Sequence, residues 1–137
     1  KNVRYTIEDN FFTFWFRFIY KYSYMLEIEN YESLKAIVNR DYETFSGLML
    51  ERYFKRMLIE THRYTRIGGW WDRKGENEID LIAENELDDE VVFYEVKRKA
   101  ENIDLGVLKR KADTFLKAAG EFWGYSMAYK GLSMEDM

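Results

Sequence analysis

The sequence predicts an α/β domain in which helices flank a mixed central sheet and further helices precede it. Three segments with the composition of strands follow one another, and stretches rich in turn-forming residues separate them. An amphipathic helical pattern comes next, followed by a last strand-like segment. A long helical pattern precedes the first strand, so the expected core order is helix, three strands, helix, strand.

Length and composition narrow the class of protein. A chain of 137 residues has room for one domain, and 47% hydrophobic with 34% charged residues is typical of a globular protein. The absence of Cys excludes disulfides and zinc–thiolate sites, and one His cannot form a histidine cluster. No apolar run approaches the roughly 18 residues of a membrane helix, so we expect a cytoplasmic protein without a membrane partner. Because the chain begins with Lys, we expect it to be a piece of a longer protein.

Residues 1–40 are predicted to form an aromatic-rich helical segment. One helix is expected from about residue 10 to residue 22 and a short one over residues 31–38, with Asp and Asn residues as their caps. The first helix is apolar nearly all round, which is typical of a helix buried on more than one side. We interpret it as a docking element for an absent domain or for a second copy, through residues 10–24. Ordinary core packing is the alternative.

Residues 41–137 are predicted to form the core of the domain. A longer helix should run from about Asp41 to Glu60, and Asp104 should open the amphipathic helix that Gly120 ends. The strands are expected over residues 64–71, 78–84, 91–99 and 122–129.

Glu51 is the first candidate functional residue. Helical geometry places it in the apolar stripe of its helix, between the positions of Leu48 and Leu58. A buried carboxylate without a partner is unfavourable and needs a hydrogen bond or a metal ion. Gly47, one turn earlier, leaves room for another group to approach. A side chain that reaches solvent at the edge of the stripe is the alternative.

Asp80 is the second candidate, because Asp is a poor strand former and stands here among apolar neighbours. Strand alternation predicts Ile79, Leu81 and Ala83 on one face of the sheet, and Asp80 with Ile82 on the other. A solvent-facing residue on a half-exposed strand is the alternative explanation.

Glu95 and Lys97 are the third candidate, an acid and an amine two positions apart on the same predicted face of a strand. By itself this pair is weak evidence, because a surface ion pair has the same pattern. The pair is stronger evidence for a functional site when it is taken together with Asp80 on the preceding strand.

Together these residues resemble the motif of the PD-(D/E)XK nuclease superfamily, whose restriction-endonuclease-like core has the order αβββαβ. Asp80, Glu95 and Lys97 match the motif, and Glu51 matches an extra acid that many members carry on the first helix. Ile79 stands where the motif has Pro, which many members also lack.

The resemblance implies hydrolysis of phosphodiester bonds in DNA with Mg²⁺ or Mn²⁺. Asp80 and Glu95 would be hard oxygen ligands for the ion, and Glu51 would be a further ligand or an outer contact. The metal would polarise the phosphate and lower the pKa of a bound water. Lys97 would orient that water and offset the growing negative charge.

A narrower resemblance covers nearly the whole chain. Five segments carry this resemblance, residues 5–18, 67–73, 78–83, 94–97 and 125–131. In these segments the chain is similar to an uncharacterised domain family found at the C-terminal end of archaeal and bacterial AAA-type ATPases, after a winged-helix segment. This resemblance implies that ATPase and winged-helix domains belong to the same longer chain. The present chain has no Gly-x-x-x-x-Gly-Lys-Ser/Thr loop for ATP phosphates.

The charge of the chain leaves two functions open. Its 21 basic and 25 acidic residues give a net charge of −4, so the chain is acidic. A dedicated nucleic-acid binder is usually basic, with a pI above ~9. DNA contact should therefore be local, or shared with another domain. We expect metal-dependent DNA cleavage, and the alternative is a catalytically inactive nucleic-acid-binding or protein-docking module.

Overall fold

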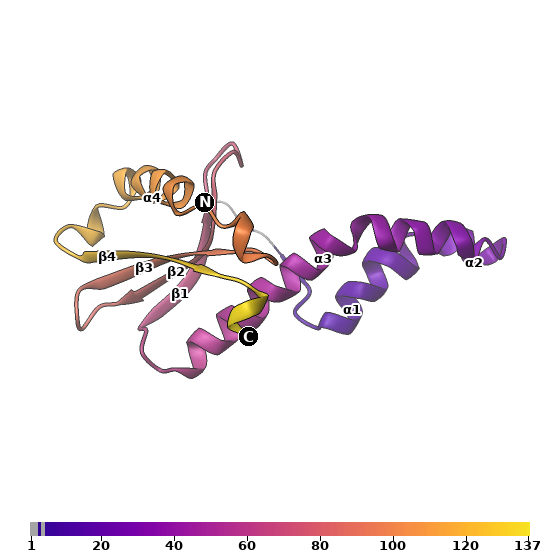
Figure 1. Ribbon diagram of the computed structural model, residues 1–137, viewed down its shortest axis with the longest axis horizontal. Coiled ribbons are helices and arrows are strands. Elements are labelled where there is room, and N and C mark those ends of the chain that lie inside the picture. Colours follow the sequence, from indigo (N-terminus) through magenta and orange to yellow (C-terminus); the bar gives the residue numbers. More distant parts are fainter. Residues whose placement is uncertain (1–2, 4) are drawn as a thin grey trace. The chain divides into compact units, whose positions relative to one another are not determined.

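The computed structural model describes residue 3 and residues 5–137 (Figure 1). The chain divides into two compact units, Lys1–Met49 and Leu50–Met137, and the boundary falls inside one long helix. No helix in the part of the chain that the structure describes is long and apolar enough to cross a membrane.

The first unit is helical. It contains α1 (Asn10–Phe14), a π-helical segment (Trp15–Tyr20), α2 (Ser23–Glu27) and the first part of α3 (Tyr31–Glu60). The Asp9 carboxylate begins α1 as its cap, since it accepts the backbone N–H of Phe12 at 2.9 Å.

The prediction of separate helices over residues 31–38 and 41–60 is wrong, because α3 is one continuous helix of 30 residues. A new helix was expected to begin at about Asp41. The Asp41 carboxylate instead accepts two hydrogen bonds of 2.9 Å from the guanidinium of Arg40, and the helical backbone continues past it.

The aromatic helix of the first unit buries one side only. Phe18 is fully buried, with ring centroids 5.0 Å from Phe14 and 5.6 Å from Phe45. Other aromatic side chains of the same segment are exposed, so they are available to a partner: Phe11, Phe12, Trp15, Phe16 and Tyr20.

The second unit contains a four-stranded mixed sheet in the order β1-β2-β3-β4. Strands β1 (Arg66–Trp71), β2 (Glu78–Asn85) and β3 (Glu90–Val96) are antiparallel, and β4 (Ser126–Leu132) runs parallel to β3. Helix α4 (Leu105–Ala118) makes the crossover between β3 and β4. The mixed α/β architecture predicted from the sequence is confirmed. β4 starts four residues later than predicted, because buried Phe122 lies in a short helical turn, Gly120–Phe122.

The sheet has an apolar core on each face. One core joins Leu50, Phe54 and Leu58 of α3 to Leu81, Ala83, Val92, Tyr94 and Val96. The other joins Leu108 and Ala112 of α4, with Phe122, to Ile79, Ile82, Val91 and Phe93. The apolar residues of β3 alternate between the two cores, as expected for a strand buried on both faces.

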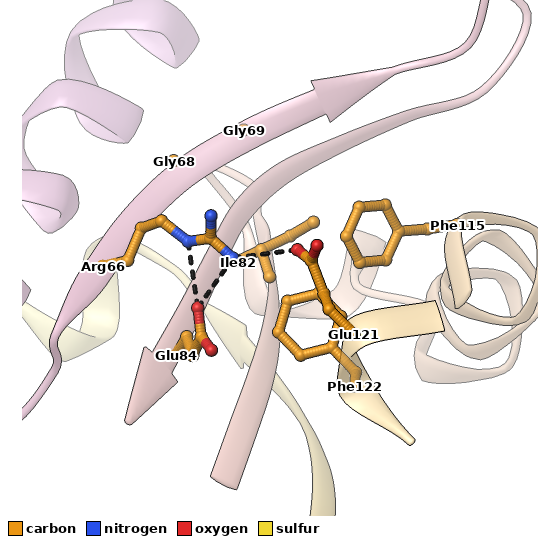
Figure 2. A pocket seen from close by; sticks show the side chains of 8 residues that line it. All are labelled: Arg66, Gly68, Gly69, Ile82, Glu84, Phe115, Glu121 and Phe122. Atoms are coloured by element: carbon orange, nitrogen blue, oxygen red, sulfur yellow. Dashed lines mark hydrogen bonds and ion pairs between the residues drawn. The ribbon is translucent and has the colours of Figure 1, made fainter. Parts of the chain in front are cut away.

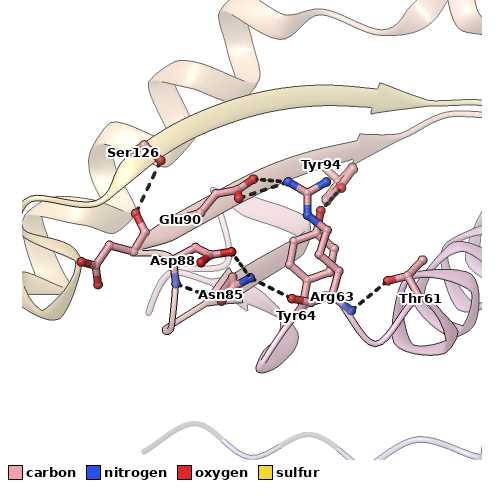
Figure 3. Close-up of polar contacts among 9 residues, drawn as sticks. Thr61, Arg63, Tyr64, Asn85, Asp88, Glu90, Tyr94 and Ser126 are labelled. Atoms are coloured by element: carbon pink, nitrogen blue, oxygen red, sulfur yellow. Dashed lines mark hydrogen bonds and ion pairs between the residues drawn. The ribbon is translucent and has the colours of Figure 1, made fainter.

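Polar contacts fix the end of α3 against the sheet (Figure 3). The Arg63 guanidinium donates to the Glu90 carboxylate at 2.8 Å, and the hydroxyls of Tyr64 and Tyr94 are 2.8 Å apart. The side-chain amide of Asn85 donates to the Arg63 carbonyl at 3.0 Å. These bonds hold the helix end that follows Glu51 in a fixed position relative to β2 and β3.

Candidate active site

A β-bulge in β2 positions Asp80. Gly68 pairs with Ile82 and Trp70 pairs with Ile79, so two residues of β2, Asp80 and Leu81, lie opposite Gly69 alone. A Cβ at Gly69 would approach the Asp80 carbonyl oxygen to 3.1 Å and the Ile79 carbonyl oxygen to 3.4 Å. Glycine therefore allows the two backbones to come this close at the bulge.

The bulge overturns the predicted faces of β2. Leu81 and Ala83 do share the α3 core, but Ile79 packs with Ile82 in the α4 core. The extra residue breaks the period of two between Ile79 and Leu81. Asp80 is thereby directed toward Glu51 of α3 and does not share the face of Ile82.

The Asp80 carboxylate also completes the sheet where the β2–β3 pairing ends. The paired residues end with Leu81 opposite Tyr94, and beyond them Asp80 Oδ2 accepts the backbone N–H of Val96 at 2.8 Å. A side chain thus takes the place of a strand carbonyl. This bond fixes Asp80 beside the last residues of β3.

Glu51 and Asp80 form a carboxyl pair, with their side chains hydrogen-bonded to each other. Burial, followed by the charge of Asp80, raises the pKa of Glu51 to about 8. Burial also raises the pKa of Asp80, although the Val96 N–H and the hydrogen bond from Glu51 oppose that shift. At neutral pH the pair therefore shares one proton, with Glu51 as the donor and Asp80 as the acceptor.

Glu95 and Lys97 lie within electrostatic range of this pair. The negative charge of Glu95 contributes to the raised pKa of Asp80, and the positive charge of Lys97 opposes the rise at both Asp80 and Glu51. Glu95 is buried, and its Oε2 accepts the backbone N–H of Asp104, the cap residue of α4, at 2.9 Å. Lys97 is exposed just beyond the end of β3.

The donor chemistry fits a hard divalent cation, because every acidic candidate offers carboxylate oxygens. These carboxylates do not, however, already form a metal-binding site. Among the residues that the structure describes, no three acidic, His or Cys side chains stand close enough together to hold a metal ion. Glu51 carries a proton and Glu95 is directed toward Asp104, so an ion would require one of them to change its contacts.

Two contributors to this site were missed by the sequence reasoning. Gly69 makes room for the bulge, and the adjacent glycines Gly68 and Gly69 within a strand are a signal of such a feature. Glu78, two residues before Asp80, adds a negative charge that helps to raise the pKa of Glu51.

Comparison with known proteins places these residues within a family. The chain is 41% identical over 108 residues to the uncharacterized protein MJECL04 of Methanocaldococcus jannaschii, an alignment that covers 72% of this chain. The chain spans about a quarter of that relative, 23% of its length. No solved structure matches the chain.

A family described as archaeal and bacterial proteins of unknown function, DUF234, matches residues 15–112. This range includes Glu51, Asp80, Glu95 and Lys97 as well as the bulge that positions Asp80. Because the match covers well over half of the sequence, the chain belongs to the DUF234 family.

Proposed function

We propose that the chain is a nuclease-like domain that hydrolyses phosphodiester bonds of DNA with Mg²⁺ or Mn²⁺. The observation that carries this proposal is the carboxyl pair of Glu51 and Asp80, with Glu95 and Lys97 within electrostatic range. The order α3, β1, β2, β3, α4, β4 supports it, since this is the αβββαβ order of the restriction-endonuclease-like core.

Each side chain has a distinct role in this proposal. Asp80 and Glu95 hold the cation, and Glu51 adds a third carboxylate once it has lost its proton. The cation supplies Lewis acidity toward the phosphodiester and toward an attacking water. The Lys97 ammonium, exposed at the end of β3, orients the water and offsets the negative charge that develops on the phosphate.

The substrate is captured mainly by other parts of a longer protein. A net charge of −4 repels the phosphate backbone, so the chain alone should bind DNA weakly. The relative from Methanocaldococcus jannaschii is about four times as long as the matched part, which leaves room for further domains there. We propose that this chain is the C-terminal domain of an AAA-type ATPase whose ATPase and winged-helix domains bring DNA to the site.

The test is a plasmid-nicking assay with Mn²⁺ on the longer, ATPase-containing protein. Lys97→Ala should remove cleavage and leave metal binding largely intact, because Lys97 acts in the transition state. Glu95→Ala should remove both cleavage and metal binding. Lys99→Ala and Glu101→Ala are matched controls, because they make the same changes at exposed neighbouring positions and should leave cleavage unchanged.

Two results would count against the proposal. Nicking that persists unchanged in Lys97→Ala and Glu95→Ala would show that the activity comes from a contaminant. Absence of cleavage with every divalent metal tried, on duplex, single-stranded and branched DNA, would leave the non-catalytic function as the better account.

A second candidate function is a catalytically inactive module that binds nucleic acid or another protein. It is favoured by the internal contacts of the acidic residues, since Asp80 accepts the Val96 N–H and Glu95 accepts the Asp104 N–H. These bonds stabilise the carboxylates as a structural network without a metal ion. In that case, Asp80→Asn should destabilise the fold, and Mn²⁺ should leave the melting temperature of the wild-type chain unchanged.

A further inference from the structure

A cavity of about 240 Å³ lies beside β1 on the α4 face of the sheet, the opposite face from Glu51 (Figure 2). Its apolar wall consists of Ile82, Phe115 and Phe122, and the backbone of Gly68 lines it from β1. An adjoining hollow of about 380 Å³ shares part of its rim. Neither space contains a residue of the carboxyl pair, so the cavity is separate from the candidate active site.

Gly68 keeps this cavity open. A Cβ at Gly68 would meet no atom of the described residues within 4 Å, and the backbone there is not in the left-handed region. Gly69 next to it is explained by the close carbonyl of Asp80, whereas neither packing nor conformation requires glycine at position 68. Glycine inside a strand is unfavourable, and it often marks a place where a ligand approaches the backbone.

The rim of the cavity already holds a guanidinium group. Figure 2 shows the Arg66 guanidinium between the carboxylates of Glu84 and Glu121, at 2.9 Å from Nε to Glu84 Oε1 and 3.0 Å from Nη2 to Glu121 Oε1. It also lies over the ring of Phe122, 5.9 Å from the centroid. Glu84 is buried, and its second oxygen accepts the Tyr125 hydroxyl at 3.1 Å.

The charges around the two hollows are unbalanced. Glu84, Glu86 and Glu121 line them together with Arg66 as the only cation among the lining residues, so the formal charge there is −2. The Arg66 side chain covers Glu84 but is itself 62% exposed, so it leaves the cavity open to solvent. A cationic group with an apolar stem suits this combination of carboxylates and aromatic rings.

We propose that this cavity binds an alkylguanidinium group, with the alkyl stem over Gly68 and the planar cation beside Glu121. A guanidinium is favoured over an ammonium because its planar fork pairs with carboxylates and stacks on rings, as Arg66 itself does. The group comes either from a free arginine-like molecule or from an arginine side chain of a polypeptide. The proposal does not depend on nuclease activity, since the cavity lies on the other face of the sheet.

The test is a titration of the 137-residue chain followed by amide chemical shifts, at constant ionic strength. Butylguanidinium should give saturable shifts at Arg66, Gly68 and Phe122, and butylammonium should bind more weakly. Glu121→Gln should lower the affinity for butylguanidinium roughly tenfold through the loss of one charge-assisted hydrogen bond, and Glu101→Gln should leave that affinity unchanged. A tripeptide Gly-Arg-Gly that binds more tightly than butylguanidinium would identify a polypeptide source, and weaker binding of it would identify a free molecule.

Gly68→Val provides the second variant. Valine is a good strand former and its side chain would occupy the space over the backbone of residue 68, so the melting temperature should be maintained or raised while butylguanidinium binding is lost. The inference is overturned if no saturable shifts occur, if Gly68→Val binds as the wild type does, or if Glu121→Gln and Glu101→Gln weaken binding equally.

Discussion

Burial and the charge of Asp80 raise the pKa of Glu51 to about 8 from its ordinary value of 4.5, so the folded chain holds a proton that the unfolded chain releases. Between these two values the native state binds more protons than the unfolded state, and the free energy of unfolding therefore decreases as the pH rises. The contribution is fully present below pH 4.5 and is lost as the pH passes through 8. The raised pKa of Asp80 acts in the same direction.

Glu51→Gln should remove most of this dependence. Glutamine keeps the shape and a hydrogen-bond donor for Asp80 and never ionises, so we expect it to stabilise the chain by about 1–2 kcal/mol at pH 9 and to have little effect at pH 5. Urea unfolding between pH 5 and pH 9 measures this, with Glu101→Gln as the control at an exposed position. An unchanged slope with pH in Glu51→Gln would contradict the assignment of the proton to Glu51.

At the scale of residues, the position of Glu51 on its helix could be predicted from the sequence, whereas the direction of the Asp80 side chain could not. Glu51 was expected to face inward because the period of 3.6 continues without interruption along α3. The face of Asp80 could not be predicted, because strand alternation assumes one residue opposite another and the bulge places two opposite Gly69. The contact of Glu95 with the cap of α4 depends on a turn after β3, Ala100–Asn102, that has no strong sequence signal.

At the scale of elements, the two adjacent glycines of β1 provide a matched test of the bulge. Gly69→Ala should destabilise the chain by about 1 kcal/mol, because the new Cβ would approach the Asp80 carbonyl oxygen to 3.1 Å. Gly68→Ala should be neutral or stabilising by up to about 1 kcal/mol, since its Cβ meets open space and alanine restricts the unfolded chain. Chemical unfolding of both variants measures the difference. Equal effects of the two substitutions would contradict the close approach at the bulge.

Element boundaries were predictable where one local signal dominates. Asp104 caps α4 as predicted, with its Oδ1 accepting the Val107 N–H at 3.1 Å. The predicted start of β4 was wrong because phenylalanine is common in strands, which favoured a strand beginning at Phe122. In the structure Phe122 lies in the turn after α4, and the centroid of its ring is 5.7 Å from that of Phe115. Tertiary packing overrides local preference at that point.

At the scale of the whole molecule, the exposed aromatic side chains of the first unit predict self-association. Phe12 and Phe16 are 50% and 46% exposed, and aromatic patches of this kind are typical of interfaces. We expect the chain to sediment as a concentration-dependent oligomer, and the double variant Phe12→Ser/Phe16→Ser to shift it toward monomer. Leu87→Ser is the control, because Leu87 is equally apolar and 88% exposed but lies in the second unit. A wild-type chain that remains monomeric at high concentration would rule out a second copy as the partner.

Asp80 and Glu95, the two proposed ligands of the metal ion, stand on neighbouring strands near the protonated Glu51. Crystals of the chain soaked in Mn²⁺ at a pH above 8, where Glu51 has lost its proton, test whether these two carboxylates bind a metal ion. We expect an anomalous difference peak in contact with the carboxylates of Asp80 and Glu95, and no peak there in Asp80→Asn crystals. Wild-type crystals that show no anomalous peak between these carboxylates, even at millimolar Mn²⁺, would contradict this expectation.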